Sequence, residues 1–286
     1  MAKRSTRKFE AYVMHAHHDT PATYSELFQR LAKLKPEDRL YRYSTEVIIA
    51  FPIVVKEGSG YFIQAVEGGD DSALVLNVET GNTRENLLGR SELLSHATHF
   101  TVSPRKRRAA IEYSQRGAKA PVLALAIEGI LKAQYPDLGD IGFAFAPVIR
   151  ENFITEINAF ERIREANIRV TRPNASWTDH YTDLSKLAED SGGDKVAVEI
   201  KAGRSASLKK NAGIVRVIKD VVSDNQPYLD DAKVTGTRKD ETSETTVHAK
   251  KHIQHTKVTV EADDAGVPVV TDIRSKLSKF LSSILG

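Results

Sequence analysis

Short apolar runs separated by turns dominate the first half of the chain. Strand patterns cover residues 8–17, 46–56, 60–67, 73–79, 99–103 and 109–114. Glycine-rich turns between several of these runs are typical of an antiparallel meander. Apolar positions at helical spacing predict a helix over 23–34, where Thr23 and Glu26 have capping-box spacing, and another over 121–134 that begins with proline. A short helical piece is expected near 85–94.

The second half mixes strands and helices in the same way. Strands are predicted over 141–149, 167–173 and 195–203, helices over 150–166 and 207–225, and a long two-stranded ribbon over 232–261. The chain closes on an amphipathic helix through Ile273, Leu277 and Leu281, which could pack on its own core or on a second copy.

Irregular alternation of strands and helices, with strands that favour hairpins, predicts an α+β fold of antiparallel, meander-rich sheets with packed helices. We expect two lobes. The first spans residues 1–150, and the second spans 151–286 and includes the ribbon and the terminal helix.

Composition excludes several classes of protein. The chain has 286 residues, 41% of them hydrophobic and 28% charged, which is typical of a globular protein. The absence of cysteine excludes a disulfide scaffold, a thiolate zinc site, an iron–sulfur cluster and a cysteine nucleophile. No stretch approaches the roughly 18 apolar residues that span a bilayer, and the basic start lacks the apolar core of a signal peptide. We therefore expect a cytoplasmic protein.

Charge is distributed unevenly although the net charge is only +3. Residues 101–135 contain seven Lys or Arg against two Asp or Glu, and residues 201–260 contain twelve against seven. Residues 46–100 and 136–200 are acidic in turn. Alternating blocks indicate a polarised surface, although a mosaic of solvated charges would give the same pattern.

Clustered cations are the strongest candidate site. They lie before and after a strand, around the start of a predicted helix and on the predicted ribbon, and four more (Lys3, Arg4, Arg7 and Lys8) form a candidate basic arm. Such groups neutralise phosphates without reading bases. Aromatic residues are sparse near them apart from Tyr113, which favours duplex over single-stranded nucleic acid. The predicted contacts are Arg105, Lys106, Arg107, Arg108, Arg116, Lys119, Lys201, Arg204, Lys209, Lys210, Lys250, Lys251 and Lys257.

Glu199 and Lys201 are the main catalytic alternative. An E-x-K tripeptide on a strand occurs in PD-(D/E)xK nucleases, where the glutamate and an upstream aspartate hold a divalent metal and the lysine helps to activate water. Asp183, Asp190 and Asp194 are the candidate partners, but the first two fall in a predicted helix and the third in a turn only five residues upstream. A surface ion pair gives the same tripeptide.

Histidines suggest a zinc site without completing one. His15 and His17 share one face of the first strand, with His18 and Asp19 next to them, and the distant histidines of the predicted ribbon, His248, His252 and His255, could add ligands. Surface or hydrogen-bonded core histidines explain the pattern equally, and no metal or other cofactor is predicted. Serine-hydrolase and nucleotide-binding motifs are missing, so no enzyme is predicted.

The order of elements resembles the RexA-like phage-exclusion proteins. The similarity rests on the meander, residues 111–131, 141–153, 167–174 and 195–203 around a variable acidic segment, and 232–261. It implies a homodimeric, two-domain DNA-binding protein without enzymatic activity, encoded by a prophage and acting with a separate membrane protein. It carries no invariant catalytic residues to this chain.

We therefore expect a cytoplasmic, sequence-nonspecific protein that binds double-stranded DNA and acts as the sensor of a prophage-encoded phage-exclusion system, an antiviral defence. The alternatives are a metal-dependent nuclease centred on Glu199 and Lys201, and a non-enzymatic protein-interaction module.

Overall fold

The computed structural model divides the chain into two compact units. The first comprises Met1–Glu10, Ala16–Ala144 and Thr256–Gly286, and the second comprises Ala11–His15 and Phe145–His255. The described residues are 3–16, 22–69, 74–76, 83–85, 94–171, 191, 193, 195–224, 229–263 and 267–285. Among them, no helix is long and apolar enough to cross a membrane.

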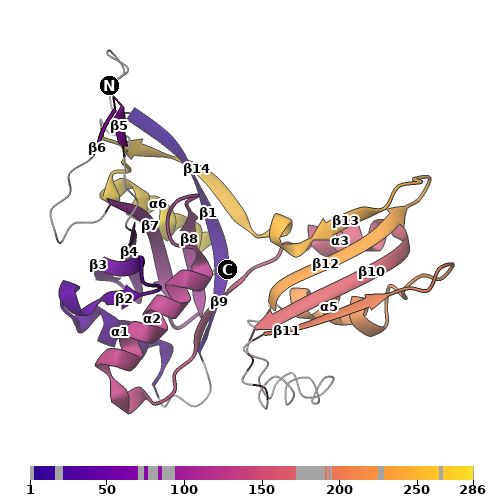
Figure 1. The fold of residues 1–286 in the computed structure, drawn as a ribbon, viewed down its shortest axis with the longest axis horizontal. Helices are drawn as coiled ribbons and strands as arrows, with labels where there is room; N and C mark the ends of the chain where they lie inside the picture. Colours follow the sequence, from indigo (N-terminus) through magenta and orange to yellow (C-terminus); the bar gives the residue numbers. More distant parts are fainter. Residues whose placement is uncertain are drawn as a thin grey trace. The chain divides into compact units, whose positions relative to one another are not determined.

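An antiparallel meander forms most of the larger sheet (Figure 1). Its order is β14-β1-β8-β7-β4-β3-β2, and β9 also pairs with β1. These strands are β1 Lys3–Ala16, β2 Leu40–Arg42, β3 Val47–Glu57, β4 Gly60–Gly69, β7 Leu94–Ser103, β8 Arg108–Tyr113, β9 Phe143–Pro147 and β14 His255–Ala262. Each neighbouring pair from β2 to β8 is antiparallel, which confirms the predicted α+β class and its meander. Strands β5 (Leu74–Leu76) and β6 (Thr83–Glu85) pair separately.

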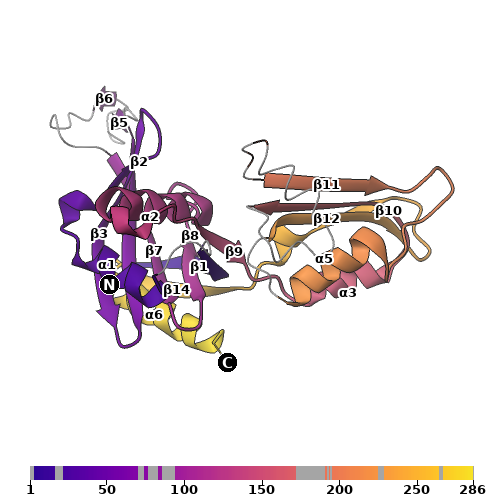
Figure 2. The ribbon, with the colours of Figure 1, turned by 90° about the horizontal axis from the view of Figure 1, so that it is seen from below.

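Helices cover both faces of this sheet. The aromatic ring of Phe28, in α1 (Tyr24–Lys33), lies 5.9 Å from that of Tyr61, and Arg274, in α6 (Val270–Ser283), lies 5.6 Å from the centre of Phe62. Successive side chains of a strand point to opposite faces, so α1 and α6 lie on opposite sides. Helix α2 (Ala120–Gln134) and α6 also flank the strands in Figure 2. The capping box of Thr23 and Glu26 is present at the start of α1.

The second unit is built on a smaller antiparallel sheet. Its order is β11 (Lys195–Lys201), β10 (Phe160–Thr171), β12 (Leu229–Arg238) and β13 (Thr245–His248). Helices α3 (Asn152–Ala159) and α5 (Gly213–Ser223) cover one face (Figure 2). Buried side chains of β10 and β12, such as Ile168 and Val234, pack against Val215 and Ile218 of α5. The alternate strand positions are polar, as expected of an antiparallel sheet with one solvated face.

Four predicted elements differ from the structure. The predicted helix over 150–166 ends at Ala159, where β10 begins, because pairing with β11 and β12 outweighs the helical pattern. The predicted helix over 207–225 begins only at Gly213. The long ribbon does not form, since β12 pairs with β10 and β13 while β14 joins the larger sheet. The terminal helix, assigned to the second lobe from sequence, belongs to the first unit, where it packs on its sheet. The helix predicted near 85–94 falls almost entirely outside the described residues.

Arg39 is a buried cation that fastens α1 to the sheet. Its guanidinium donates to the carbonyls of Ala32, at 2.9 Å, and Leu34, at the end of α1, and its own carbonyl accepts the amide of Phe51 at 3.1 Å. Only 7% of the residue is exposed, and burial lowers its pKa. The charge is retained because the pKa of arginine starts far above neutrality.

We predict that Arg39→Met destabilises the protein by about 2–3 kcal/mol, because it leaves buried carbonyls at the end of α1 without donors. Urea unfolding followed by circular dichroism measures this change. Arg42→Ala is the control, since Arg42 is exposed and, among the described residues, donates only to the Thr45 carbonyl. It should shift stability by no more than about 0.5 kcal/mol. Equal effects of the two substitutions would contradict the role of Arg39.

Candidate nucleic-acid interface

The basic run after Ser103 is the turn of the β7–β8 hairpin. The amide of Arg107 donates to the Pro104 carbonyl at 3.1 Å, and the pair formed by Ser103 and Arg108 closes the turn. The side chains of Arg105, Lys106 and Arg107 are exposed. Within the described part of the chain, these three cations have no hydrogen-bond or ion-pair partner. We call these three residues the basic turn.

Arg107 occupies a strained backbone conformation. Its φ of 51° lies in the left-handed region, and Asp240, with φ of 62°, is the other described residue besides glycine with a positive φ. A residue with a Cβ is less stable there by about 1–2 kcal/mol, and glycine is the usual occupant of such a turn position. The chain therefore keeps a cation at a position where glycine would be more stable.

Strand β8 divides the basic cluster that the sequence suggested. Arg108 begins the strand and is half-buried; burial, together with the neighbouring charge of Arg107, lowers its pKa. Arg116 and Lys119 follow the other end of the strand. Because six residues of a strand span about 17 Å, the basic turn and these two residues lie at separate places.

At the end of β8 away from the turn, two lysines lie over the ring of Tyr113. The ammonium groups of Lys8 and Lys119 lie 5.1 and 4.8 Å from the centre of its ring, which is exposed. Lys8 also pairs with Glu10 at 2.6 Å, and Lys119 donates to the Ser114 carbonyl. The predicted basic arm, from Lys3 onward, is strand β1 rather than a free segment, and its cations are held in part by these contacts. Arg116 is exposed and free of partners among the described residues.

Lys201 lies in an ion cluster on β11. Its ammonium lies 2.7 Å from a carboxylate oxygen of Glu199 and 3.2 Å from one of Glu165. Lys201 lowers the pKa of Glu199, and hydrogen bonds to the two carboxylates raise the pKa of Lys201, first through Glu199. The two carboxylates therefore neutralise the charge of Lys201 locally, and the lysine keeps its proton. The aspartates proposed as metal partners, at 183, 190 and 194, lie outside the described residues.

Two arginines that the sequence analysis did not single out shape the loop after β11. Arg162 donates to the carbonyls of Arg204 and Ala206 at 2.8 and 3.1 Å, and Arg164 donates to that of Gly203 at 2.8 Å. The side chain of Arg204 is exposed on this loop. These contacts hold the loop in one conformation. In the sequence, the alternation of arginine with apolar residues on β10 was the only signal for them.

The remaining predicted contacts of residues 201–260 differ in whether they have a partner. Lys209 is exposed before α5, whereas Lys210 donates to the Asn158 carbonyl at 3.1 Å. Lys250 lies 3.9 Å from Asp231, and Lys251 is exposed beside it. Lys257 is exposed on β14, which belongs to the other unit from Thr256 onward.

The structure therefore separates available cations from occupied ones. Lys201, Lys250, Lys119 and Lys210 have partners, and Arg108 is half-buried. Of the predicted phosphate contacts, those that are exposed and have no partner among the described residues are Arg105, Lys106, Arg107, Arg116, Arg204, Lys209, Lys251 and Lys257.

The histidines of the predicted ribbon, His248, His252 and His255, belong to the second unit. The ring of His252 lies 5.5 Å from that of Phe153, and its Nδ1 lies 3.1 Å from Oδ1 of Asn152. Burial is the main cause that lowers the pKa of both His252 and His248. In the described ranges, no three His, Asp or Glu side chains gather as metal ligands. His17, His18 and Asp19 fall outside those ranges.

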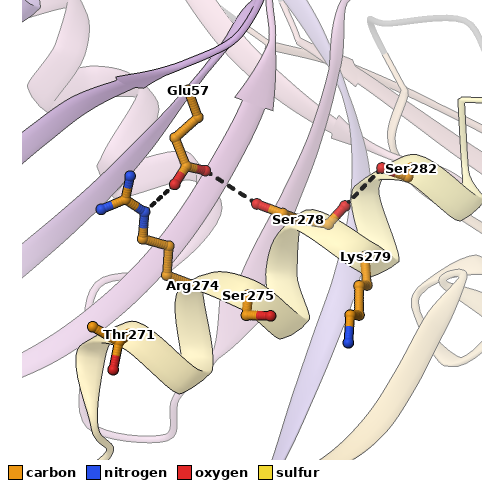
Figure 3. A pocket seen from close by; sticks show the side chains of 7 residues that line it. All are labelled: Glu57, Thr271, Arg274, Ser275, Ser278, Lys279 and Ser282. Atoms are coloured by element: carbon orange, nitrogen blue, oxygen red, sulfur yellow. Dashed lines mark hydrogen bonds and ion pairs between the residues drawn. The ribbon is translucent and has the colours of Figure 1, made fainter.

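A polar depression lies between α6 and the β3–β4 turn (Figure 3). Arg274 pairs with Glu57, and Ser278 donates to the same carboxylate at 3.1 Å. Hydroxyl groups and Lys279 line the rest. Its main charged pair is satisfied internally, and it contains none of the predicted phosphate contacts.

We predict that His252 makes stability depend on pH. Its folded pKa lies below the unfolded value near 6.5, so the unfolded chain binds more protons between the two values. Stability is therefore lost as pH falls below about 6.5. Urea midpoints between pH 7.5 and 5 should fall less in His252→Gln, which cannot be protonated. An unchanged pH dependence would contradict the prediction.

No protein-family model matches the chain, and no curated protein is significantly similar to it.

Proposed function

We propose that the protein binds double-stranded DNA through its phosphate backbone, without reading base sequence, and that the basic turn is the principal contact. The observation that carries this proposal is Arg107, an exposed cation kept in a left-handed conformation. Strain of this kind is concentrated at functional sites. A turn selected only for stability would have glycine there.

The charge of the basic turn supports the same function. Three adjacent cations repel one another, and no described carboxylate offsets them. Phosphate groups would supply the missing negative charge, and binding would release the counterions condensed on the duplex. Arginine and lysine are the side chains that most often contact DNA phosphates, so the composition of the turn fits positioning on the backbone.

The biological setting comes from the resemblance to RexA-like proteins. We propose a cytoplasmic homodimer that senses DNA during infection, without catalysing a reaction, in a prophage-encoded phage-exclusion system with a separate membrane-protein effector. The basic turn supplies the DNA contact that such a sensor needs.

Replacing Arg105, Lys106 and Arg107 together by alanine should weaken binding about equally on unrelated duplexes. If each cation neutralises one phosphate, the slope of log K against log salt should become shallower by about 3. Fluorescence anisotropy at several salt concentrations measures both quantities. The DNA should remain intact in magnesium, and cutting abolished by Glu199→Ala would favour the nuclease alternative instead.

The control for this experiment removes the same net charge from cations that already have partners. It combines alanine at Lys201, Lys250 and Lys276, the last of which pairs with Asp272 at 2.7 Å. We expect this variant to bind nearly as tightly as the parent. Equal losses in the two triple variants would mean that net charge, not the basic turn, determines binding.

Arg107→Gly should separate stability from binding. Relief of the left-handed strain should leave stability unchanged or raise it by up to about 1 kcal/mol, while loss of one cation should weaken DNA binding. Asp240→Gly is the matched control, because it relieves the same kind of strain without removing a cation. Tighter or unchanged DNA binding by Arg107→Gly would contradict the proposed role of the turn.

A further inference from the structure

We propose that the basic turn enters the minor groove of the duplex and that the protein therefore prefers DNA whose minor groove is narrow and rich in A·T pairs. This inference rests on the proposed function and specifies which surface of the duplex the turn contacts. It concerns a preference for A·T over G·C pairs that arises from the width, potential and base edges of the minor groove, and it requires no particular base sequence.

The hydrogen-bonding chemistry of the turn matches this groove. Arginine and lysine side chains carry donors and no acceptors. The minor-groove edges of A·T pairs present only acceptors, whereas guanine adds an N2 amino donor to that groove. In the major groove guanine also presents two acceptors, but cytosine and adenine add amino donors and thymine adds a methyl group, so no base pair presents acceptors alone there. A surface made of donors alone is therefore complementary to the A·T minor groove and is opposed by the guanine amino group.

The geometry of the hairpin limits what can enter. Ser103 and Arg108 are already a ladder pair, so the loop beyond them is a single four-residue turn. The minor groove is about 6 Å wide, which admits extended side chains but excludes a two-stranded ribbon. The three side chains of the basic turn are exposed and have no partner in the part of the chain that the structure describes, so they can extend into the groove while β7 and β8 remain outside.

The identity of the cations favours the groove as well. Two of the three are arginines, Arg105 and Arg107. Narrow A-tract grooves concentrate negative potential and attract arginine in particular. The guanidinium is more weakly hydrated than an ammonium group, so it loses less when it leaves water for a confined groove.

Three duplexes of equal length and matched flanks test the inference: one with a central A·T tract, one with G·C in its place, and one with inosine replacing guanine in the G·C tract. Inosine lacks the N2 amino group, so the third duplex combines a G·C major groove with a minor groove that resembles A·T. Affinities come from fluorescence anisotropy at fixed salt. A minor-groove-binding drug such as netropsin serves as competitor.

We expect the A·T and inosine duplexes to bind about fivefold more tightly than the G·C duplex, and netropsin to remove the difference. Arg105→Lys with Arg107→Lys should reduce the preference and leave the salt slope unchanged, because the charge is kept. Circular dichroism and a thermal melt of this double variant check that it is folded.

Other results overturn the inference in distinguishable ways. Equal, salt-sensitive affinities for all three duplexes would refute groove entry and leave the proposed function standing. Inosine DNA that binds like G·C DNA and more tightly than A·T DNA would place the turn in the major groove. Failure to bind any of the three at low salt would refute the proposed function itself.

Discussion

The first strand of the chain requires partners that arrive much later. Strand β1 lies between β8 and β14, so the sheet is complete only when residues 108–113 and 255–262 are both in place. Helix α6 then covers one face, with the rings of Phe9 and Phe280 6.4 Å apart. Such long-range pairing gives a high contact order and predicts slow folding of this unit. It also makes β8 an interior strand, held on both sides.

Support from both sides matters for the basic turn, because a strained residue persists only where its surroundings determine the backbone. Toward the end of β8 away from the turn, a buried polar network joins three strands. Glu112 on β8 accepts hydrogen bonds from the backbone amide and the ring Nδ1 of His99 on β7, at 3.1 and 2.7 Å, and lies 3.4 Å from Arg7 on β1. Any slip in strand register would leave a buried carboxylate without these donors, which costs several times a normal hydrogen bond. The network thus helps to fix the register of β7 and β8, the two strands that the basic turn connects.

Local patterns in the sequence predicted local structure well. The meander and the capping box of α1 follow from apolar spacing and from two polar residues three positions apart. Residues 150–166 were predicted incorrectly as one helix, because Phe160 and Ile163 fit a helical stripe as well as a strand, and only pairing with β12 distinguishes the two. The sequence also does not show which cations have an ion-pair partner. Nothing near Lys201 in the sequence reveals Glu165, which reaches it through strand pairing.

Residues 101–135 and 201–260 have the same net charge but differ in how many of their cations are available to an anionic partner. Both basic blocks carry an excess of five positive charges, but the second supplies carboxylates of its own: Asp231 lies beside Lys250, and Glu199 just outside the block pairs with Lys201. A phosphate that approached Lys201 would also meet the carboxylates of Glu199 and Glu165, which repel it, so the contact would gain little net energy. At the basic turn no such exchange is needed. Availability of cations, rather than their number, therefore decides where an anionic partner binds, and tertiary pairing sets that availability.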